Sequence, residues 1–295
     1  MLTPQFAAVL RRCSRRGSPR LSTTVFAREE AGMAVRDGAP GRSVTGRALA
    51  LLAAFDAEHP RLTITELARR AHLPLATAHR LAAELTSWQA LDRAADGRYA
   101  IGLRLWETAA LAPVSGGLRE TALPFMQDLY EATGENVHLA VRDGFDALYV
   151  EKLCGHRSVP LVSRTGSRLP LHPTGVGKAL LAQADPGFVR DYAERPLARF
   201  TPYTITQRGR LLREVHATAT RGYALTSEEM TLGSCSVAVA IPGGGPGPAG
   251  ALGVVARSVR TDLQRLVPDL RAAAEGVARR LADTAAAERR RSRRT

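Results

Sequence analysis

The sequence predicts an α+β protein of two domains, and three observations lead to this fold class. Residues Thr63–Leu85 have the pattern of two short helices joined by a tight turn, with two strand-like runs soon after them. From residue 117 onward, helical and strand-like segments interleave without a regular βαβ repeat, which favours a central antiparallel sheet. The 295 residues, 45% of them apolar, suffice for two cores, and no apolar run is long enough to span a bilayer. We therefore expect no membrane partner.

The net charge of +13 is concentrated at the two ends of the chain. Residues 1–42 carry eight arginines and three acids, and residues 277–295 carry seven arginines and two acids. The part between them has a net charge of only +3. Such tails indicate loose electrostatic attraction to polyanions and not a specific binding site. A protein that coats nucleic acid through its tails is therefore one alternative reading.

Residues 1–42 show no dependable hydrophobic periodicity, and we predict a basic, disordered extension there. Their arginine- and serine-rich start is also typical of an organelle transit peptide, and Met33 offers an alternative start. Cys13, Cys154 and Cys235 are widely spaced and form no CxxC pair, which favours a reducing compartment, here the cytoplasm. The same spacing argues against a structural zinc site. We expect neither a metal nor a cofactor.

The first domain is expected to begin at Ser43. From Val44 to Phe55 apolar residues recur at helical spacing, and this helix should end before His59-Pro60. Together with the helix pair and the strand-like runs that follow, this helix is expected to form one compact unit over residues 43–101.

The helix pair has clear start signals. Thr63 and Glu66 are three residues apart, the spacing of a capping box, and predict the first helix start. Pro74 suits the first position of the second helix, because its missing N–H needs no partner there, so the turn falls near His72. The second helix would bury Ala78, Leu81, Ala82 and Leu85. This is the helix-turn-helix pattern, which DNA-binding proteins share with purely structural helix pairs.

An Asp-Gly pair lies between two short strand-like runs, Leu91–Arg93 and Arg98–Ile101, and predicts a β-hairpin. A helix-turn-helix followed by a hairpin is a winged helix, whose wing rests on the phosphate backbone beside the major groove. We therefore predict double-stranded DNA as a partner. The candidate contacts lie on the helix pair and on the wing: Thr65, Leu75, Ala76, Thr77, His79, Arg80 and Arg98.

Residues 102–116 are predicted to form a linker helix and a hinge, because an amphipathic run there ends in proline, serine and glycine. The second domain is expected over residues 117–285, and a basic tail over 286–295. Periodicity within the second domain predicts helices at 118–133, 175–182, from 185 onward, 208–221 and 263–287. It predicts strands at 136–141, 147–152, 159–163, 236–241 and 251–256.

These residues resemble the IclR-type transcriptional regulators of bacteria and archaea, over about residues 43–282. In the first domain the resemblance rests on SVTGRALALLAAF, ITELARRAHLPLATAHRLAAEL and GRYAIGLRLWE. In the second it rests on SRTGSRLPLHPTGVGKALLA, on RGYA at 221–224, and on two acids ahead of Gly233. The resemblance implies a winged helix-turn-helix, a linker helix and a GAF-like effector-binding domain. It also implies a homodimer or homotetramer that binds operator DNA and a small, often carboxylated or aromatic, metabolite.

The resemblance further indicates which side chains matter. At the head of the recognition helix, Thr77 and Arg80 match the family's polar residues. A serine is usual where this chain has Ala76, and a basic residue is common at Leu75. The implied effector pocket consists of Leu161, Leu169, Gly175, Val176, Thr226, Ser236, Gly253 and Val255.

Members that bind small acids carry an acid at position 226, a cysteine at 236 and hydroxyl groups at 253 and 255. Three of the four changes in this chain lower the polarity of the pocket or remove a hydrogen-bonding group. We therefore expect a roomier site for an organic acid with an apolar body. The glycines at 175 and 177 would leave backbone N–H groups free for its carboxylate.

An enzyme that acts on a small carboxylate or acyl substrate, with an accessory helix-turn-helix, is the alternative from another class. We predict no catalytic residues, because no nucleophile elbow and no metal-ligand spacing is present. His172 and Lys178 could be read as catalytic, but the resemblance and its position favour His172 as a structural or pocket-wall residue. The effector, the operator sequence, repression versus activation, and dimer versus tetramer stay open at this level.

Overall fold

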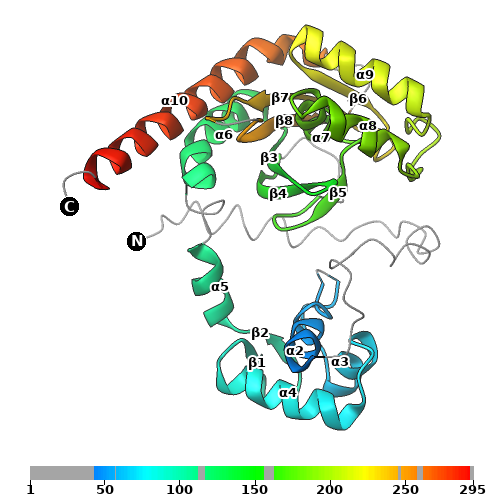
Figure 1. Cartoon of the computed structure of the whole chain (residues 1–295), viewed down its shortest axis with the longest axis vertical. Coiled ribbons are helices and arrows are strands. Elements are labelled where there is room, and N and C mark those ends of the chain that lie inside the picture. Colours follow the sequence, from blue (N-terminus) through cyan, green and yellow to red (C-terminus); the bar gives the residue numbers. More distant parts are fainter. Residues whose placement is uncertain are drawn as a thin grey trace. The chain divides into compact units, whose positions relative to one another are not determined.

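The computed structural model describes residues 43–56, 58–111, 117–155, 163–244, 247–257 and 262–292 (Figure 1). The chain divides into two compact units, whose described parts are residues 43–111 and 117–292. Each unit has its own hydrophobic core. No described helix combines the length and the apolar character that a bilayer crossing requires.

The first unit consists of helices α2 (Val44–Leu52), α3 (Ile64–Arg70), α4 (Leu75–Ser87) and α5 (Leu103–Ala110), with a hairpin of β1 (Leu91–Arg93) and β2 (Tyr99–Ile101). Its core joins α2, α3, α4 and the hairpin through buried side chains such as Leu51, Leu67, Leu81, Leu91 and Tyr99. The predicted winged helix-turn-helix is confirmed.

Local signals explain the starts of these helices. Thr63 and Glu66 form the expected capping box, because each side chain accepts from the other's backbone N–H. His72 closes the turn with a φ of +54°, a left-handed conformation that L side chains rarely adopt. Pro74 is the N-cap residue and not the first helical residue, with a ψ of 142°. Gly97 takes a φ of +78° in the hairpin turn, as an Asp-Gly turn requires.

The second unit is built on a six-stranded antiparallel sheet with the order β5-β4-β3-β8-β7-β6. The strands are β3 (Asn136–Asp143), β4 (Asp146–Leu153), β5 (Arg168–Pro170), β6 (Ala224–Ser227), β7 (Cys235–Ile241) and β8 (Gly250–Ala256). The predicted central antiparallel sheet is confirmed. The edge strands β5 and β6 are absent from the sequence-based assignment, because runs of three and four residues carry too little alternation to be recognised.

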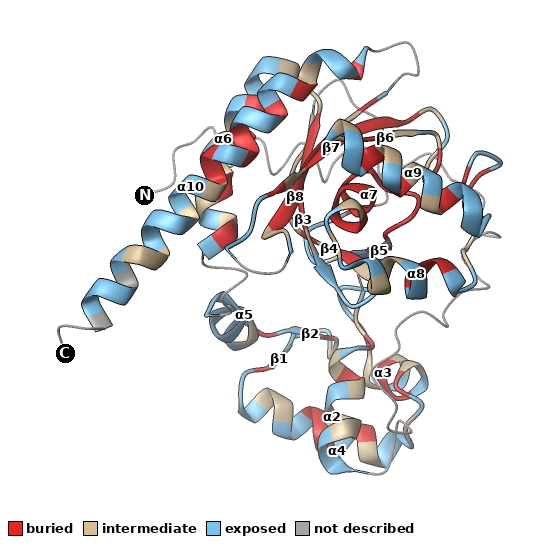
Figure 2. Cartoon of the chain, turned by 45° about the horizontal axis from the view of Figure 1, so that its top comes forward, coloured by how far each residue is buried: buried red, intermediate tan, exposed pale blue. Residues whose placement is uncertain are grey.

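Helices cover both faces of this sheet. They are α6 (Arg119–Thr133), α7 (Gly175–Ala182), α8 (Pro186–Glu194), α9 (Arg208–Arg221), the 3₁₀ turn η2 (Leu263–Leu266) and α10 (Val267–Ser292). The core of one face joins α6 and α10 to the sheet, and the core of the other face joins α7, α8 and α9 to it (Figure 2). α10 continues to Ser292, past the predicted end at 287.

The two faces of the sheet differ in side-chain size. The face toward α6 and α10 carries large apolar residues, among them Val137, Leu139, Val237, Leu252 and Val254. Several residues on the α7 face are small: Ala140, Ala238, Ala251 and Gly253. Because successive side chains of a strand point to opposite faces, alternating large and small residues produce this difference. A short helix can therefore lie close to the sheet on the α7 side.

Candidate functional site

Most of the predicted DNA contacts of the helix-turn-helix are accessible to solvent. Thr65, Ala76, His79 and Arg80 are exposed, Leu75 is 52% exposed, and Thr77 is half-buried. The opposite side of α4 buries Ala78, Leu81 and Ala82 in the core, which holds the helix in place. Among the described residues, no acid pairs with the guanidinium of Arg80. That group is therefore available to an external acceptor.

Arg98, the predicted wing contact, is partly engaged within the unit. Its Nη1 lies 3.5 Å from Oε2 of Glu66, and its Nε lies 3.9 Å from Oδ2 of Asp96. Both pairs are substantially exposed, so water and salt weaken them and the guanidinium can exchange partners at little cost. The pairing links the wing to the start of α3.

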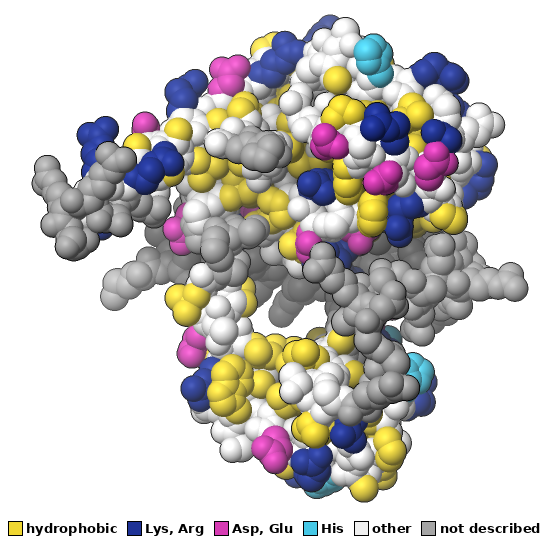
Figure 3. All heavy atoms as spheres, in the orientation of Figure 1, with side chains coloured by type: hydrophobic (Ala, Val, Ile, Leu, Met, Phe, Trp, Pro, Cys, Tyr) yellow, Lys and Arg dark blue, Asp and Glu magenta, His cyan; other side chains and the backbone are white. Residues whose placement is uncertain are grey.

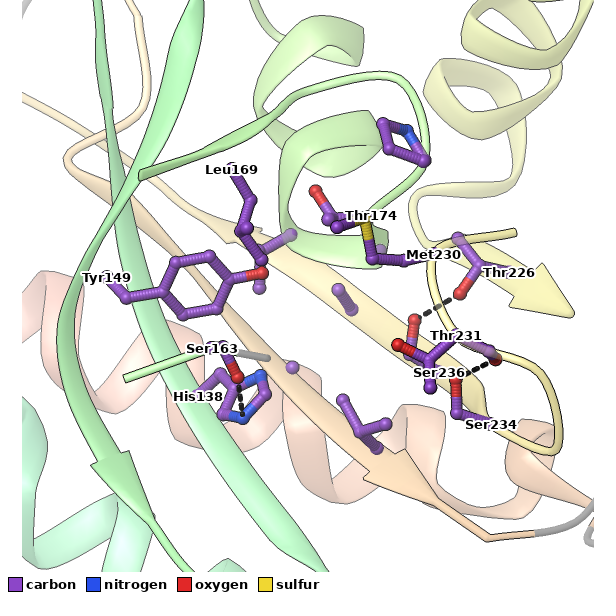
Figure 4. A pocket seen from close by; sticks show the side chains of 16 residues that line it. His138, Tyr149, Ser163, Leu169, Thr174, Thr226, Met230, Thr231, Ser234 and Ser236 are labelled. Atoms are coloured by element: carbon purple, nitrogen blue, oxygen red, sulfur yellow. Dashed lines mark hydrogen bonds between the residues drawn. The ribbon is translucent and has the colours of Figure 1, made fainter. Parts of the chain in front are cut away.

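The second unit contains a cavity on the α7 side of the sheet (Figure 4). About 50 Å³ of it can hold the centre of a water-sized sphere, within a hollow of about 500 Å³ that includes space open to solvent. Seven of the eight residues that the resemblance implied line this cavity: Leu169, Gly175, Val176, Thr226, Ser236, Gly253 and Val255. Leu161 lies outside the described residues, as do positions 159–162 of the predicted strand at 159–163.

Two of the residues that line the cavity are glycines at which α7 and the sheet meet closely. A Cβ at Gly175 would lie 2.4 Å from Ser236 Oγ, and a Cβ at Gly253 would lie 2.9 Å from Val176 Cγ1. Real Cβ contacts are longer than both distances. The sheet residues at this contact, Gly253 and Ala238, project little or nothing from the sheet, and Val176 fills the space above Gly253.

One end of the cavity carries hydroxyl groups and the start of α7. Thr226 Oγ1 and Ser236 Oγ lie 2.5 Å apart, across the pairing of β6 with β7. Thr174 caps α7 by accepting from the N–H of Gly177 at 3.2 Å, so the prediction of a free Gly177 amide is wrong. The N–H groups of Gly175 and Val176 have no acceptor among the described residues. They remain available for a ligand carboxylate.

The other end of the cavity carries side chains that the sequence-based prediction missed. His138 Nε2 lies 3.3 Å from Ser163 Oγ, and the rings of His138 and Tyr149 meet edge to face with centroids 5.2 Å apart. Burial, with the nearby charge of Lys152, lowers the pKa of His138 to about 3, so its ring is neutral. Burial also raises the pKa of Tyr149. The remaining lining residues are Pro173, Thr174, Met230, Thr231, Ser234 and Ala238.

Neither His172 nor Lys178 lines this cavity. His172 is buried, with Nδ1 at 3.0 Å from the hydroxyl of Tyr192 and Nε2 at 2.9 Å from the carbonyl oxygen of Ala198. Lys178 is buried and pairs with Glu229, its Nζ lying 2.5 Å from Oε1. The buried position of His172 is consistent with a structural role. Among the described residues, no cluster of three or more histidines, cysteines or acids could hold a metal ion.

Two family descriptions match the sequence. The IclR helix-turn-helix domain matches residues 44–95, and the bacterial transcriptional regulator IclR C-terminal domain matches residues 112–279. The chain belongs to the IclR family of bacterial transcriptional regulators. As an IclR-family protein it is a ligand-responsive, DNA-binding regulator of transcription, which confirms the predicted function.

Named IclR relatives agree with this assignment. XynR, an HTH-type transcriptional regulator of Escherichia coli K12, is 32% identical over 197 residues, or 66% of this chain and 78% of the relative. The AllR repressor of Escherichia coli K12 is 29% identical over 221 residues, covering 74% and 82%. Among solved structures, an IclR homologue from Microbacterium hydrocarbonoxydans in complex with 4-hydroxybenzoate has a TM-score of 0.78 and 31% identity, covering 82% of this chain and 100% of that one. Thermotoga maritima IclR has a TM-score of 0.68 and 27% identity, covering 80% and 98%.

Proposed function

We propose that a small organic acid with an apolar body binds in the cavity of the second unit, and that its binding changes the affinity of the first unit for operator DNA. The observation that carries this is the cavity itself. It combines two free amides and a hydroxyl pair at one end with the apolar Leu169, Val176 and Val255 along its wall. The Microbacterium hydrocarbonoxydans homologue was crystallised with an acid of this kind, 4-hydroxybenzoate.

For the DNA side we propose that α4 enters the major groove. Thr77 and Arg80 supply hydrogen bonds there, and Leu75 supplies an apolar contact such as a thymine methyl group accepts. Arg98 and the wing would contact phosphates, which position the protein without reading sequence. The basic ends of the chain would add affinity in the same sequence-independent way.

An enzymatic role of the cavity is the second candidate, because Ser163 and His138 are a hydroxyl and an imidazole within reach of each other. Two features weigh against it. A base with a pKa of about 3 removes a proton from serine poorly at neutral pH. The relatives are also named as transcriptional regulators and not as enzymes. We therefore assign the pair to ligand binding.

We also propose a cytoplasmic homo-oligomer, dimer or tetramer. Helix α5 supports the association, because it leaves Leu103, Trp106 and Leu111 at 67%, 63% and 84% exposure. Hydrophobic side chains on the surface of the first unit are visible in the space-filling view (Figure 3). Exposed apolar groups of this size on a helix favour burial against another copy of the chain.

The proposal is tested in two arms. In the first, operator DNA selected from a random pool is titrated with the protein. A direct base contact is worth about 1–3 kcal/mol, so Arg80→Ala and Thr77→Ala should each weaken binding about 5- to 150-fold. The exposed Arg213 of α9 serves as control, since Arg213→Ala should leave DNA affinity unchanged.

In the second arm, a panel of organic acids is screened by thermal shift on the whole protein. A true effector raises the melting temperature in proportion to RT ln(1 + [L]/Kd) and alters the DNA titration. Normal DNA binding by both α4 variants would refute the assignment of the recognition helix. If no acid shifts either measurement, the assignment of the cavity is wrong.

A further inference from the structure

Helix α5 begins against the end of α4, the proposed recognition helix (Figure 1). The hairpin of β1 and β2 leaves the end of α4 and returns to it, because Leu91 pairs with Ile101. The next residue, Gly102, donates its N–H to the carbonyl oxygen of Ala90 at 2.8 Å. The start of α5 is therefore hydrogen-bonded to the segment that directly follows α4.

Gly102 makes this contact too close for any side chain. Its φ of −79° is one that any residue can adopt, so the backbone conformation does not require glycine. A Cβ at Gly102 would lie 2.2 Å from the carbonyl oxygen of Gln89 and 3.0 Å from the carbonyl carbon of Ala90. Both are backbone atoms, so no side-chain rotation can relieve the overlap. The glycine is needed because the two segments of backbone touch.

The end of α4 is itself closed by a defined backbone motif. The N–H of Ala90 donates to the carbonyl oxygen of Leu85 at 2.8 Å, and the N–H of Gln89 donates to that of Thr86 at 2.9 Å. This is the Schellman pattern, whose left-handed residue is usually glycine. Here it is Gln89, with a φ of +64°. A residue other than glycine keeps this conformation where the surrounding structure holds it, so α5 rests on a fixed surface.

A side-chain contact adds a second point of attachment. The guanidinium carbon of Arg104 lies 4.6 Å from the ring centroid of Trp88, within the range of a cation–π interaction. Trp88 is the C-cap residue of α4, and Arg104 lies in the first turn of α5. One contact fixes where α5 begins. Two contacts also fix the direction in which it points.

The direction of α5 determines a distance on DNA if a second copy binds to this helix. Leu103 and Trp106 are three residues apart, so they share one face of α5, and both are exposed. In a two-fold dimer joined through this face, the angle of α5 on α4 sets how far apart the two α4 helices lie. The eight residues of α5 span about 12 Å. A tilt of about 16° at its start therefore displaces its end by about 3.4 Å, the rise of one base pair.

We propose that Gly102, Trp88 and Arg104 are positioning residues that set the spacing between the two half-sites of the operator. They contact no base. They hold α5 on α4, and α5 holds the second copy of the chain. Dimeric helix-turn-helix proteins bind half-sites whose separation matches the separation of their recognition helices. The inference rests on the proposed roles of α4 in the major groove and of α5 in association.

The test measures half-site spacing separately from half-site sequence. The operator selected with the wild type is compared with versions that have one base pair inserted or removed between the half-sites, and with a single half-site. The wild type should bind both altered operators at least about tenfold more weakly, a difference of about 1.4 kcal/mol. The double variant Trp88→Leu/Arg104→Met removes the side-chain contact and should reduce this penalty to about threefold or less.

Two further variants complete the test. Gly102→Ala forces the start of α5 away from α4, so it should no longer prefer the wild-type spacing. Glu107→Gln is the control, because Glu107 is exposed on α5 outside the contacts with α4, and it should leave the spacing penalty unchanged. All three variants should bind the single half-site like the wild type.

Each outcome decides the proposal. A double variant that keeps the tenfold penalty overturns it, and so does a double variant whose only defect is weaker binding to the single half-site. Trp88 and Arg104 are accessible to solvent, so the double variant decides the question even where Gly102→Ala fails to fold. The proposed functions fail on different results. Normal half-site binding by Arg80→Ala refutes the recognition helix, and a monomer in sedimentation refutes the association.

Discussion

The buried ion pair of Lys178 and Glu229 should be required for the stability of the second unit. Lys178 is 1% exposed and Glu229 is 7% exposed, and Oε2 of Glu229 is buried without a hydrogen-bond partner among the described residues. Burial raises the pKa of Glu229, and the charge of Lys178 opposes that rise. Each charge therefore compensates part of the cost of burying the other.

Removing one member of a buried pair costs about 3–5 kcal/mol, because the remaining charge has lost both water and partner. Lys178→Met keeps the length and packing of the side chain while removing the cation. We expect it to lower the free energy of unfolding by that amount. The double variant Lys178→Met/Glu229→Gln removes both charges and should recover most of the loss, giving a strong coupling in a double-mutant cycle.

The pair formed by Arg208 and Glu194 provides the control. Its N–O distance is also 2.5 Å, but its side chains are 53% and 57% exposed. Arg208→Met should therefore cost less than about 1 kcal/mol, since exposed pairs contribute little. The two pairs have equal N–O distances. If Lys178→Met lowers the free energy of unfolding more than Arg208→Met does, burial and not the contact alone determines the contribution of an ion pair.

The assay is urea unfolding followed by two signals. Both tryptophans, Trp88 and Trp106, belong to residues 43–111, so tryptophan fluorescence reports on the first unit. Far-UV circular dichroism reports on both. Lys178→Met should shift the unfolding transition of the second unit, which only circular dichroism detects. The transition followed by tryptophan fluorescence should stay unchanged. A loss below about 1 kcal/mol, or a double variant as unstable as the sum of its parts, would refute this reasoning.

Two further predictions concern the cavity. Between pH 6.5 and about 3 the unfolded chain binds a proton at His138 that the folded protein does not, so stability falls as pH falls. Between pH 7 and pH 5 the wild type should lose about 2 kcal/mol more than His138→Phe in urea titrations, and parallel losses would contradict the depressed pKa. Gly175→Ala should force the Ser236 hydroxyl away from Thr226, because the new Cβ lies 2.4 Å from that oxygen. Calorimetry should show weaker acid binding with an almost unchanged melting temperature, and unchanged affinity would contradict the close packing.

Much of the local structure is determined by neighbouring residues and could be predicted from the sequence. The capping box of Thr63 and Glu66, the Asp-Gly turn at Gly97 and the alternation within β7 and β8 all act over a few residues. Their energetics do not depend on the rest of the fold. For the same reason the helix-turn-helix, the wing and the strands β3, β4, β7 and β8 appear where the sequence predicts them.

Contacts between residues distant in the chain could not be predicted in this way. Ser163 meets His138 across 25 positions, and Lys178 meets Glu229 across 51. These contacts depend on strand register and on how closely α7 approaches the sheet, and no short pattern encodes either. The amides of Gly175 and Gly177 are a further example. The sequence predicted that both are free, but in the structure the Gly177 N–H donates to Thr174 Oγ1.

The sequence by itself determined the order of the elements, the helix-turn-helix and which strand residues are large or small, because propensity, capping and alternation are local. Only the tertiary structure decided which face of the sheet holds the cavity and which polar groups line its two ends. Those features arise from the packing of segments distant in the chain, where close contact and burial set the energy. Burial also lowers the pKa of His138, so that its ring is neutral, and it makes Lys178 and Glu229 depend on their ion pair.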